Sequence, residues 1–323
     1  MKLVVLDGYA LNPGDLSWEP LQAIANCQIF DRTAERHIVA HAADAEIVLT
    51  NKVPLRSATL AALSALRYIG VLATGFDIID LEQADRQNVV VTNVPAYSTN
   101  SVAQLVFALV LEICNHVGLH NAAVQSGEWS RSPDFCFRKT PLVELHGKTM
   151  GIVGHGRIGK QVSDIARAFG MRVIVTTSRR PENLPADIEW DSVENVFAES
   201  DVISLHCPLR PETRGLVNSA RIATMKPSAI LINTSRGGLI VERDLADALN
   251  SGRLAGAGLD VLSVEPPTAG NPLIGAKNCI LSPHIAWATK ESRTRCLAIA
   301  TDNVKNWLAG HPENVVNRPR VAG

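Results

Sequence analysis

The fold can be predicted from one stretch of this sequence, Met150-Gly151-Ile152-Val153-Gly154-His155-Gly156-Arg157-Ile158-Gly159. Its apolar run, Gly151 to Val153, predicts a short buried strand. The glycines that follow match the pattern G-x-G-x-x-G. From Lys160 to Phe169 apolar side chains recur at helical spacing, and Gly170 then ends the pattern. The stretch therefore predicts a strand, a glycine turn and a helix in immediate succession.

This strand-turn-helix unit is what the pyrophosphate of a dinucleotide requires. Gly154 permits the tight turn, Gly156 lets the backbone approach the phosphates, and Gly159 lets the helix pack closely on the strand. The anion would then accept hydrogen bonds from N–H groups at the helix N-terminus. The alternative is a tight turn without a ligand, but the flanking strand and helix favour dinucleotide binding.

Composition narrows the class of protein. A chain of 323 residues with 46% hydrophobic residues predicts about two domains with substantial cores. The net charge of -1 argues against binding of nucleic acid or an anionic membrane. No apolar run approaches the ~18 residues of a membrane-spanning helix, and the N-terminus predicts a first strand rather than a signal peptide.

The six cysteines are scattered and form no C-x-x-C pair. This pattern favours free thiols in a reducing compartment over disulfides or zinc. We therefore expect a soluble, cytoplasmic α/β protein without a metal site.

Strand-like and helix-like segments alternate in both halves of the chain, which predicts parallel sheets covered by helices. In the first half we expect strands at Leu3–Leu6, Ile47–Leu49, Tyr68–Val71 and Val89–Thr92, with helices at Ser57–Ala65 and Leu81–Gln87. In the second half we expect strands at Val173–Thr176, Val202–Leu205, Ile230–Asn233, Ala257–Leu259 and Cys279–Leu281, with helices at Glu242–Leu249 and Lys290–Ala309.

Two segments between the halves differ from this alternation. Ser101 to Val117 predicts one long apolar helix, which would serve as a hinge element or as a face for oligomer formation. Gly127 to Thr140 is irregular and rich in aromatic residues, which suits an excursion that packs on a neighbour.

Three residues that follow predicted strands of the second half have side chains suited to catalysis: Arg236, Glu265 and His284. The carboxyl ends of parallel strands meet at one edge of a sheet, so these side chains are expected to converge. An arginine grips a carboxylate or carbonyl, a histidine donates a proton near neutral pH, and a glutamate orients the histidine. The alternative is a surface arginine, a loop glutamate and a structural histidine.

The whole chain resembles the D-isomer-specific 2-hydroxyacid dehydrogenases. Four pieces in the right order carry the resemblance: the turn Gly154–Gly159, His206-Cys207-Pro208-Leu209 with Thr213, Asn233-Thr234-Ser235-Arg236-Gly237-Gly238, and the run from Asp260 through Glu265-Pro266 to Pro283-His284. Within the family it is most similar to the glycerate dehydrogenase/hydroxypyruvate reductase branch, on pieces that include Thr50–Leu55, Ala73-Thr74-Gly75, Asn93–Thr99, Gly127–Ser130 and His284–Thr289.

The resemblance implies a fold and a division into domains. The fold would be α/β, with two Rossmann-like doubly wound parallel-sheet domains. The substrate-binding domain would be discontinuous and combine residues 1–97 with residues 288–323. Residues 98–287 would form the inserted dinucleotide-binding domain, and the protein would be a homodimer.

The resemblance also implies roles for individual residues. His284 would protonate the ketone oxygen as hydride arrives, Glu265 would orient His284 and favour its protonated ring, and Arg236 would bind the 2-keto acid. The substrate would also contact Asn51, Lys52, Thr74, Gly75 and Trp287. The cofactor would contact Gly154, Gly156, Arg157, Ile158, Gly159, Thr177, Ser178, Arg179, Arg180, His206, Cys207, Pro208, Thr213, Thr234, Ser235 and Asp260.

One departure from the dinucleotide-binding pattern bears on the identity of the cofactor. About 20 residues after the glycines, an NAD-binding protein usually carries an acidic residue for the ribose hydroxyls. This chain has Thr177 there, followed by Ser178, Arg179 and Arg180. Hydroxyls and arginines suit a 2′-phosphate, so NADP(H) is favoured, with NAD(H) as the alternative. The two arginines would otherwise form a solvated loop with Pro181 and Glu182.

The leading functional hypothesis is an oxidoreductase that reduces hydroxypyruvate or glyoxylate to D-glycerate or glycolate. A second enzyme hypothesis is a dehydrogenase of 3-phosphoglycerate or of another D-2-hydroxy acid. A hypothesis of a different class is a dinucleotide-sensing module, similar to co-repressors that share this scaffold. Turnover of a small 2-keto acid separates the enzyme hypotheses from the sensing module.

Overall fold

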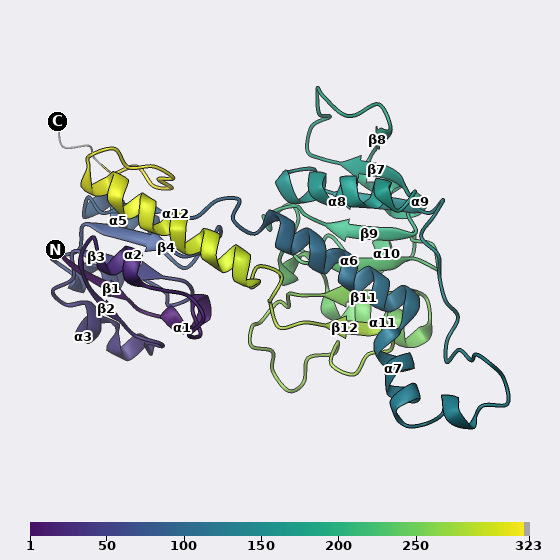
Figure 1. The fold of residues 1–323 in the computed structure, drawn as a ribbon. Helices are drawn as coiled ribbons and strands as arrows, with labels where there is room; N and C mark the ends of the chain where they lie inside the picture. Colours follow the sequence, from purple (N-terminus) through teal and green to yellow (C-terminus); the bar gives the residue numbers. More distant parts are fainter. Residues whose placement is uncertain (320–323) are drawn as a thin grey trace. The chain divides into compact units, whose positions relative to one another are not determined.

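The computed structural model describes residues 1–319, which form two compact units (Figure 1). The terminal unit comprises Met1–Ser98 and the chain from Ala288 onward. The central unit comprises Thr99–Trp287. Each unit is built on its own parallel sheet, which confirms the predicted fold class. The assignment of substrate binding to one unit and dinucleotide binding to the other stays a prediction.

The terminal unit has a five-stranded parallel sheet in the order β2-β1-β3-β4-β5. The strands are β1 Lys2–Val5, β2 Asn26–Ile29, β3 Ile47–Thr50, β4 Tyr68–Val71 and β5 Val90–Thr92. The sequence did not predict β2. Its residues alternate between exposed and half-buried at the sheet edge, so they lack the apolar run of the central strands.

Short helices surround this sheet: α1 Gly8–Leu11, α2 Glu19–Gln22, α3 Ile38–Ala42, α4 Ser57–Ala62 and α5 Leu81–Arg86, with the 3₁₀ turn η1 Glu35–His37. The helix expected to reach Ala65 ends at Ala62, because Leu63 leaves the helical conformation at ψ 71°. The long helix α12, Lys290–Leu308, returns to the sheet and packs on β4. There the ring of Trp307 lies 4.9 Å from that of Tyr68.

The central unit has a seven-stranded parallel sheet in the order β12-β11-β10-β9-β6-β7-β8. The strands are β6 Thr149–Val153, β7 Arg172–Thr176, β8 Ile188–Trp190, β9 Val202–Leu205, β10 Ile230–Asn233, β11 Gly256–Leu259 and β12 Cys279–Leu281. The chain moves outward from β6 in one direction and from β9 in the other. In such sheets ligands bind outside the carboxyl ends of the strands, where the direction reverses. The edge strand β8 was not predicted.

Helices cover both faces of this sheet. The helices α6 Thr99–Asn115 and α8 Arg157–Ala168 share one buried cluster. A second cluster on the other face includes residues of α9 Val193–Glu199, α10 Ser219–Ile222 and α11 Glu242–Ser251. Close packing of α6 needs a glycine in β11, since an ideal Cβ on Gly258 would lie 2.8 Å from Leu109 Cβ.

The single helix expected from Ser101 to Val117 is wrong. His116 adopts a left-handed conformation with φ 46° and ends α6, after which α7 runs from Val117 to Gln125. The excursion that follows contains one 3₁₀ turn, η2 Trp129–Arg131, and projects beyond α7 (Figure 1). Within the described chain, no single helix is long and apolar enough to span a membrane. The pair α6 and α7 meets that test only together, with a bend of 57°.

Candidate active site

The glycine turn connects β6 to α8 as predicted. Gly154 has φ 97°, and an ideal Cβ there would lie 2.7 Å from Cys207 N. An ideal Cβ on Gly159 would overlap Gly154 O, so this glycine lets the first turn of α8 lie against the strand end. Both positions therefore require glycine for the protein's own packing.

Gly156 differs from its two neighbours in the motif. An ideal Cβ there would meet no protein atom within 4 Å, so packing does not require glycine at this position. Gly156 is also the N-cap of α8, and no side chain caps that helix. A backbone without a side chain, beside uncapped N–H groups, suits close approach by an anion. The turn thus fits the pyrophosphate of a dinucleotide, which Gly154, Gly156, Arg157, Ile158 and Gly159 would hold.

Two histidines lie beside this turn. His206 follows β9; its N–H donates to Val153 O at 2.7 Å, and its Nε2 lies 2.8 Å from Ser204 Oγ. Burial, together with the nearby His155, lowers the pKa of His206 to about 3. Burial also lowers the pKa of His155. Ser163 Oγ donates to Gly159 O, so it accepts from His155 Nε2, 3.1 Å away.

Other residues predicted to contact the cofactor, in the loops after β9 and β10, form hydrogen bonds with one another. Ser235 Oγ donates to Cys207 O at 2.8 Å, and Thr213 Oγ1 donates to Pro208 O at 2.7 Å. Burial raises the pKa of the Cys207 thiol. Among the described atoms, Thr234 Oγ1 is buried and has no hydrogen-bond partner. Their contacts to the cofactor stay predictions.

The segment after β7 forms a small hydrogen-bonded loop. Thr177 Oγ1 donates to Arg179 O at 2.6 Å and accepts from Trp190 Nε1 at 3.2 Å. The guanidinium of Arg180 lies 6.0 Å from the centre of the Trp190 ring, within reach of a cation–π interaction. Ser178, Arg179 and Arg180 are exposed. No ion pair joins either arginine to Glu182 within the described part of the chain.

Glu265 and His284 are in direct contact. His284 Nδ1 lies 2.6 Å from Glu265 Oε2, and both side chains are partly exposed. The two residues come from the loops that follow β11 and β12, which are adjacent parallel strands. The convergence expected at this edge of the sheet is therefore present for this pair.

A buried carboxylate fixes the backbone around His284. Asp260, which is 1% exposed, accepts hydrogen bonds from Ser282 Oγ, Ile285 N and Ala286 N at 2.6, 2.9 and 2.8 Å. His284 has φ 54°, a conformation that residues other than glycine adopt rarely and mostly where the surroundings enforce it. Asp260 was predicted to contact the cofactor; that contact stays a prediction, and its carboxylate already braces the histidine loop.

Arg236 extends from the end of β10, the strand beside β11. Its side chain is exposed, and Nη1 donates to Ser235 O at 2.8 Å. Asn233 fixes the turn, since its Nδ2 donates to Arg236 O and its Oδ1 accepts from Ser235 N. An ideal Cβ on Gly237 would overlap Leu262, so the arginine loop packs directly on the loop that carries Glu265.

The predicted substrate loops belong to the terminal unit. Asp7 is buried and accepts from the N–H groups of Asn51 and Lys52 at 2.8 and 2.6 Å. Thr74 Oγ1 donates to Val94 O at 2.8 Å, and Gly75, which is half-buried, follows it directly. Trp287, at the end of the central unit, is half-buried. Substrate contacts by these residues stay predictions.

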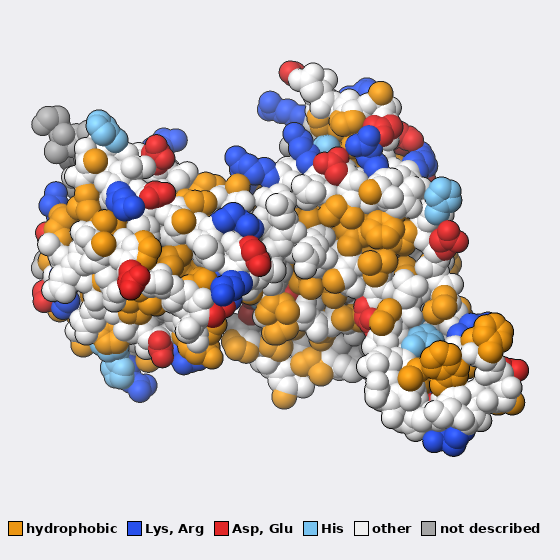
Figure 2. All heavy atoms as spheres, viewed as in Figure 1, with side chains coloured by type: hydrophobic (Ala, Val, Ile, Leu, Met, Phe, Trp, Pro, Cys, Tyr) orange, Lys and Arg blue, Asp and Glu red, His pale blue; other side chains and the backbone are white. Residues whose placement is uncertain are grey.

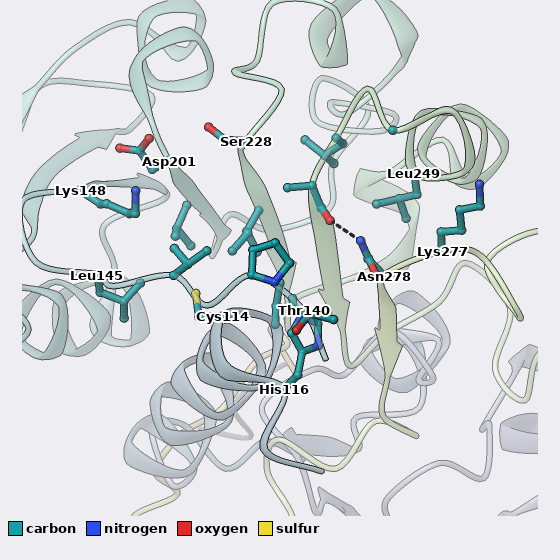
Figure 3. Close-up of a pocket in the computed structure, with 18 of the residues that line it drawn as sticks. Cys114, His116, Thr140, Leu145, Lys148, Asp201, Ser228, Leu249, Lys277 and Asn278 are labelled. Atoms are coloured by element: carbon teal, nitrogen blue, oxygen red, sulfur yellow. Dashed lines mark hydrogen bonds between the residues drawn. The ribbon is translucent and has the colours of Figure 1, made fainter. Parts of the chain in front are cut away.

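A cleft of about 550 Å³ lies at the amino-terminal ends of the strands of the central sheet (Figure 3). Its lining includes Val202 and Ile230, the first residues of β9 and β10, and Thr140 of the excursion. Asn278 donates to Ala255 O there at 3.0 Å. The cleft is therefore remote from the Glu265–His284 pair. In the described residues no group of three or more His, Cys, Asp or Glu could hold a metal ion.

Sequence reasoning missed three residues that support the predicted site loops. Asp7 bonds to the Asn51–Lys52 loop and Trp190 to Thr177, while Glu242 accepts from Ser263 N in the loop that carries Glu265. Asp7 and Trp190 occur at the end of an expected first strand and in an unpredicted strand, with no motif around them. Glu242 lies in the first turn of a predicted helix, where an acidic residue is ordinary. Only its contacts reveal its role.

His206 makes the stability of the protein depend on pH. Because its pKa is lowered from 6.5 to about 3, the unfolded chain binds a proton that the folded chain does not. The free energy of unfolding contributed by this group is complete above about pH 6.5 and declines as the pH falls toward about 3, by up to about 1.4 kcal/mol per pH unit. Denaturant unfolding between pH 7.5 and 4.5 should show a shallower decline for His206→Gln than for the wild type. Equal slopes would contradict the assignment.

Comparisons with known proteins agree with this geometry. Residues 107–286 match the family model for the NAD-binding domain of D-isomer-specific 2-hydroxyacid dehydrogenases. The chain is 49% identical to a hydroxypyruvate reductase of Blautia hydrogenotrophica, over 98% of this chain and all of the relative. It is 40% identical to a glycerate dehydrogenase of Methylorubrum extorquens, over 86% of this chain and 88% of the relative.

A solved structure extends the likeness to the fold. An acyclic imino acid reductase in complex with NADPH and D-Arg superposes with a TM-score of 0.85 at 29% identity, covering 98% of this chain and all of the other. The family expected from the sequence motifs is confirmed: this chain belongs to the D-isomer-specific 2-hydroxyacid dehydrogenases.

Proposed function

We propose that this protein reduces hydroxypyruvate or glyoxylate to the corresponding D-glycerate or glycolate, with a nicotinamide dinucleotide as the hydride donor. The observation that carries the proposal is the 2.6 Å contact between His284 Nδ1 and Glu265 Oε2, on the sheet that also carries the glycine turn. The 49% identity to a hydroxypyruvate reductase supports this choice of substrate.

In this proposal the proton donor is a single atom, Nε2 of His284. Nδ1 of His284 faces Glu265, so Nε2 is the nitrogen left to point toward a substrate. A protonated imidazole in this orientation can donate its Nε2 proton to a ketone oxygen while Nδ1 stays bonded to Glu265. The product of that transfer is a neutral ring that is still bonded to Glu265, so the orientation of the imidazole survives the step.

Arg236 supplies the complementary charge. Its exposed guanidinium follows the strand beside the Glu265 loop and can bind the carboxylate or the carbonyl of a 2-keto acid. A positive group there stabilises the oxygen that gains negative charge during reduction. A bound nicotinamide supplies the hydride itself. The residues of this chain supply orientation, charge and the proton.

Removing the proton donor should abolish turnover without abolishing cofactor binding. For His284→Ala we expect a fall in kcat of about 10²–10⁴-fold, the usual contribution of general acid–base catalysis. The measurement is NAD(P)H absorbance with a panel of 2-keto acids, alongside fluorescence titration of the cofactor. Near-normal kcat in the variant would show that another group donates the proton. Cofactor binding with no turnover of any small 2-keto acid by the wild type would favour the sensing module.

We further propose that NADP(H) is the preferred cofactor, through Ser178, Arg179 and Arg180. These residues follow β7, where Thr177 replaces the acidic residue that would repel a 2′-phosphate. The Trp190 indole supports this loop from β8 by its bond to Thr177 and by its proximity to Arg180. Exposed guanidiniums without carboxylate partners suit a phosphate ligand.

The double variant Arg179→Ala/Arg180→Ala tests this preference. It should raise KM for NADPH by about tenfold or more and leave KM for NADH almost unchanged, because only NADPH carries the phosphate. Steady-state kinetics with both cofactors measure the ratio of kcat/KM. The variant Arg243→Ala, which removes an exposed arginine of α11, is the matched control. A wild type that prefers NADH would contradict the proposal.

The proposal also includes a homodimer and a cytoplasmic location. All six cysteines are free thiols, as is usual in a reducing compartment. The buried side of α6, the face guessed from sequence, is used within the central unit. Exposed apolar side chains instead lie on α7 and the excursion: Val117, Leu119, Trp129 and Phe135. Figure 2 shows hydrophobic side chains gathered on this projecting segment.

A group of exposed apolar side chains on one segment is typical of a surface that binds another protein. The partner that we propose is a second copy of this chain. Phe135 is 90% exposed in the single chain and would be buried in the proposed dimer. The double variant Trp129→Glu/Phe135→Glu should therefore shift the protein from dimer to monomer in sedimentation velocity. Ile274→Glu, an exposed apolar site outside the excursion, should leave the dimer intact. A wild type that sediments as a monomer would refute the homodimer.

A further inference from the structure

We propose that Glu242 is a positioning residue that holds the loop carrying Glu265 and thereby keeps Glu265 in contact with His284. The inference rests on the proposed function of that pair. Glu242 bonds to the loop at Ser263 and Asn271, so its effect on the reaction passes through the loop.

The loop needs such support because most of its residues are not buried. Residues 263–270 are all exposed and form no helix or strand. Burial resumes only at the two flanks, with Val261 at 3% and Asn271 at 9% exposed. Segments with few buried apolar contacts open at low free-energy cost. Yet Glu265 lies within this exposed stretch and must hold a 2.6 Å contact with His284.

Glu242 bonds to both ends of the exposed stretch. Its Oε1 accepts from Ser263 N at 2.6 Å, and its Oε2 accepts from Asn271 Nδ2 at 2.9 Å. Asn271 is itself fixed, because its Oδ1 accepts from Leu273 N at 3.0 Å. One carboxylate on the rigid helix α11 therefore clamps the loop where it leaves the core and where it returns.

The clamp acts close to the reacting pair. Leu262 N, the residue before Ser263, donates to Glu265 Oε1 at 3.0 Å, while Glu265 Oε2 faces His284. The direction of the Glu265 carboxylate thus depends on the backbone at Leu262 and Ser263. If that backbone shifts, Glu265 turns with it and loses its hydrogen bond to His284 for part of the time.

Helix capping does not explain these contacts. The N-cap of α11 is Val241, and no side chain caps the helix. The bonds of the Glu242 carboxylate to Ser263 N and Asn271 Nδ2 leave its own helix and end on the loop. Asp247 provides a matched control, since it is an exposed residue of α11 whose carboxylate makes no hydrogen bond or ion pair within the described part of the chain.

A double-mutant cycle tests the proposal. Glu242→Ala should lower kcat for hydroxypyruvate by about tenfold or more, as expected for misplacement of a catalytic group, while the Kd for the cofactor stays unchanged. In a Glu265→Gln background the same substitution should cost almost nothing further, because the residue through which it acts is already disabled. Asp247→Ala should have no effect in either background.

A second readout does not depend on turnover. Amide hydrogen exchange in residues 262–271 should be faster in Glu242→Ala than in the wild type and unchanged in Asp247→Ala. Glu242→Gln keeps one acceptor and should fall between the two, so it replaces the alanine variant if that variant does not fold.

Unchanged exchange and unchanged kcat in Glu242→Ala would overturn the proposal, as would a loss of equal size in both Glu265 backgrounds. If the wild type turns over no 2-keto acid, the proposed function fails. Hydrogen exchange then still decides whether Glu242 clamps the loop.

Discussion

The structure of the central unit depends on one constraint: neighbouring parallel strands all end at the same edge of the sheet. The strands β10, β11 and β12 are adjacent and short, so the loops that follow them start side by side. Glu265 and His284 are 19 positions apart in the sequence, and they meet there because their strands are neighbours. The glycine turn after β6 lies at the same end of the sheet, so the proposed cofactor binding and proton transfer would share one scaffold.

The strand ends bring these loops together, but carboxylates keep them in place. Asp260 accepts from the Ser282 hydroxyl before His284 and from the backbone N–H groups of Ile285 and Ala286 after it. Glu242 holds the loop of Glu265 through two hydrogen bonds. In each case one carboxylate, directly after β11 for Asp260 and in α11 for Glu242, accepts several hydrogen bonds from an irregular segment. A reacting pair that is partly exposed can thus be kept ordered by hydrogen bonds where little apolar surface is buried.

The sequence predicted the fold well where its signals are local. The glycine turn, the central strands and the family follow from motifs, and Glu265 and His284 lie together as their strand positions implied. The predictions failed where tertiary context decides. The edge strands β2 and β8 carry no apolar run, and the left-handed backbone of His116 breaks a helix whose apolar pattern continues. The clamp by Glu242 was invisible, because a first-turn glutamate has the same appearance whether it bonds to solvent or to a distant loop.

The most direct measurement follows deuterium from the cofactor to the product. The wild-type protein is incubated with hydroxypyruvate and NADPH that carries deuterium at C4 of the nicotinamide, separately in its two stereochemical forms, and the glycerate is analysed by mass spectrometry and chiral chromatography. We expect D-glycerate with deuterium at C2 from one of the two forms, with one mole of glycerate formed for each mole of NADPH oxidised. Glycerate without deuterium from either form, glycerate of the L configuration, or no glycerate would contradict this expectation.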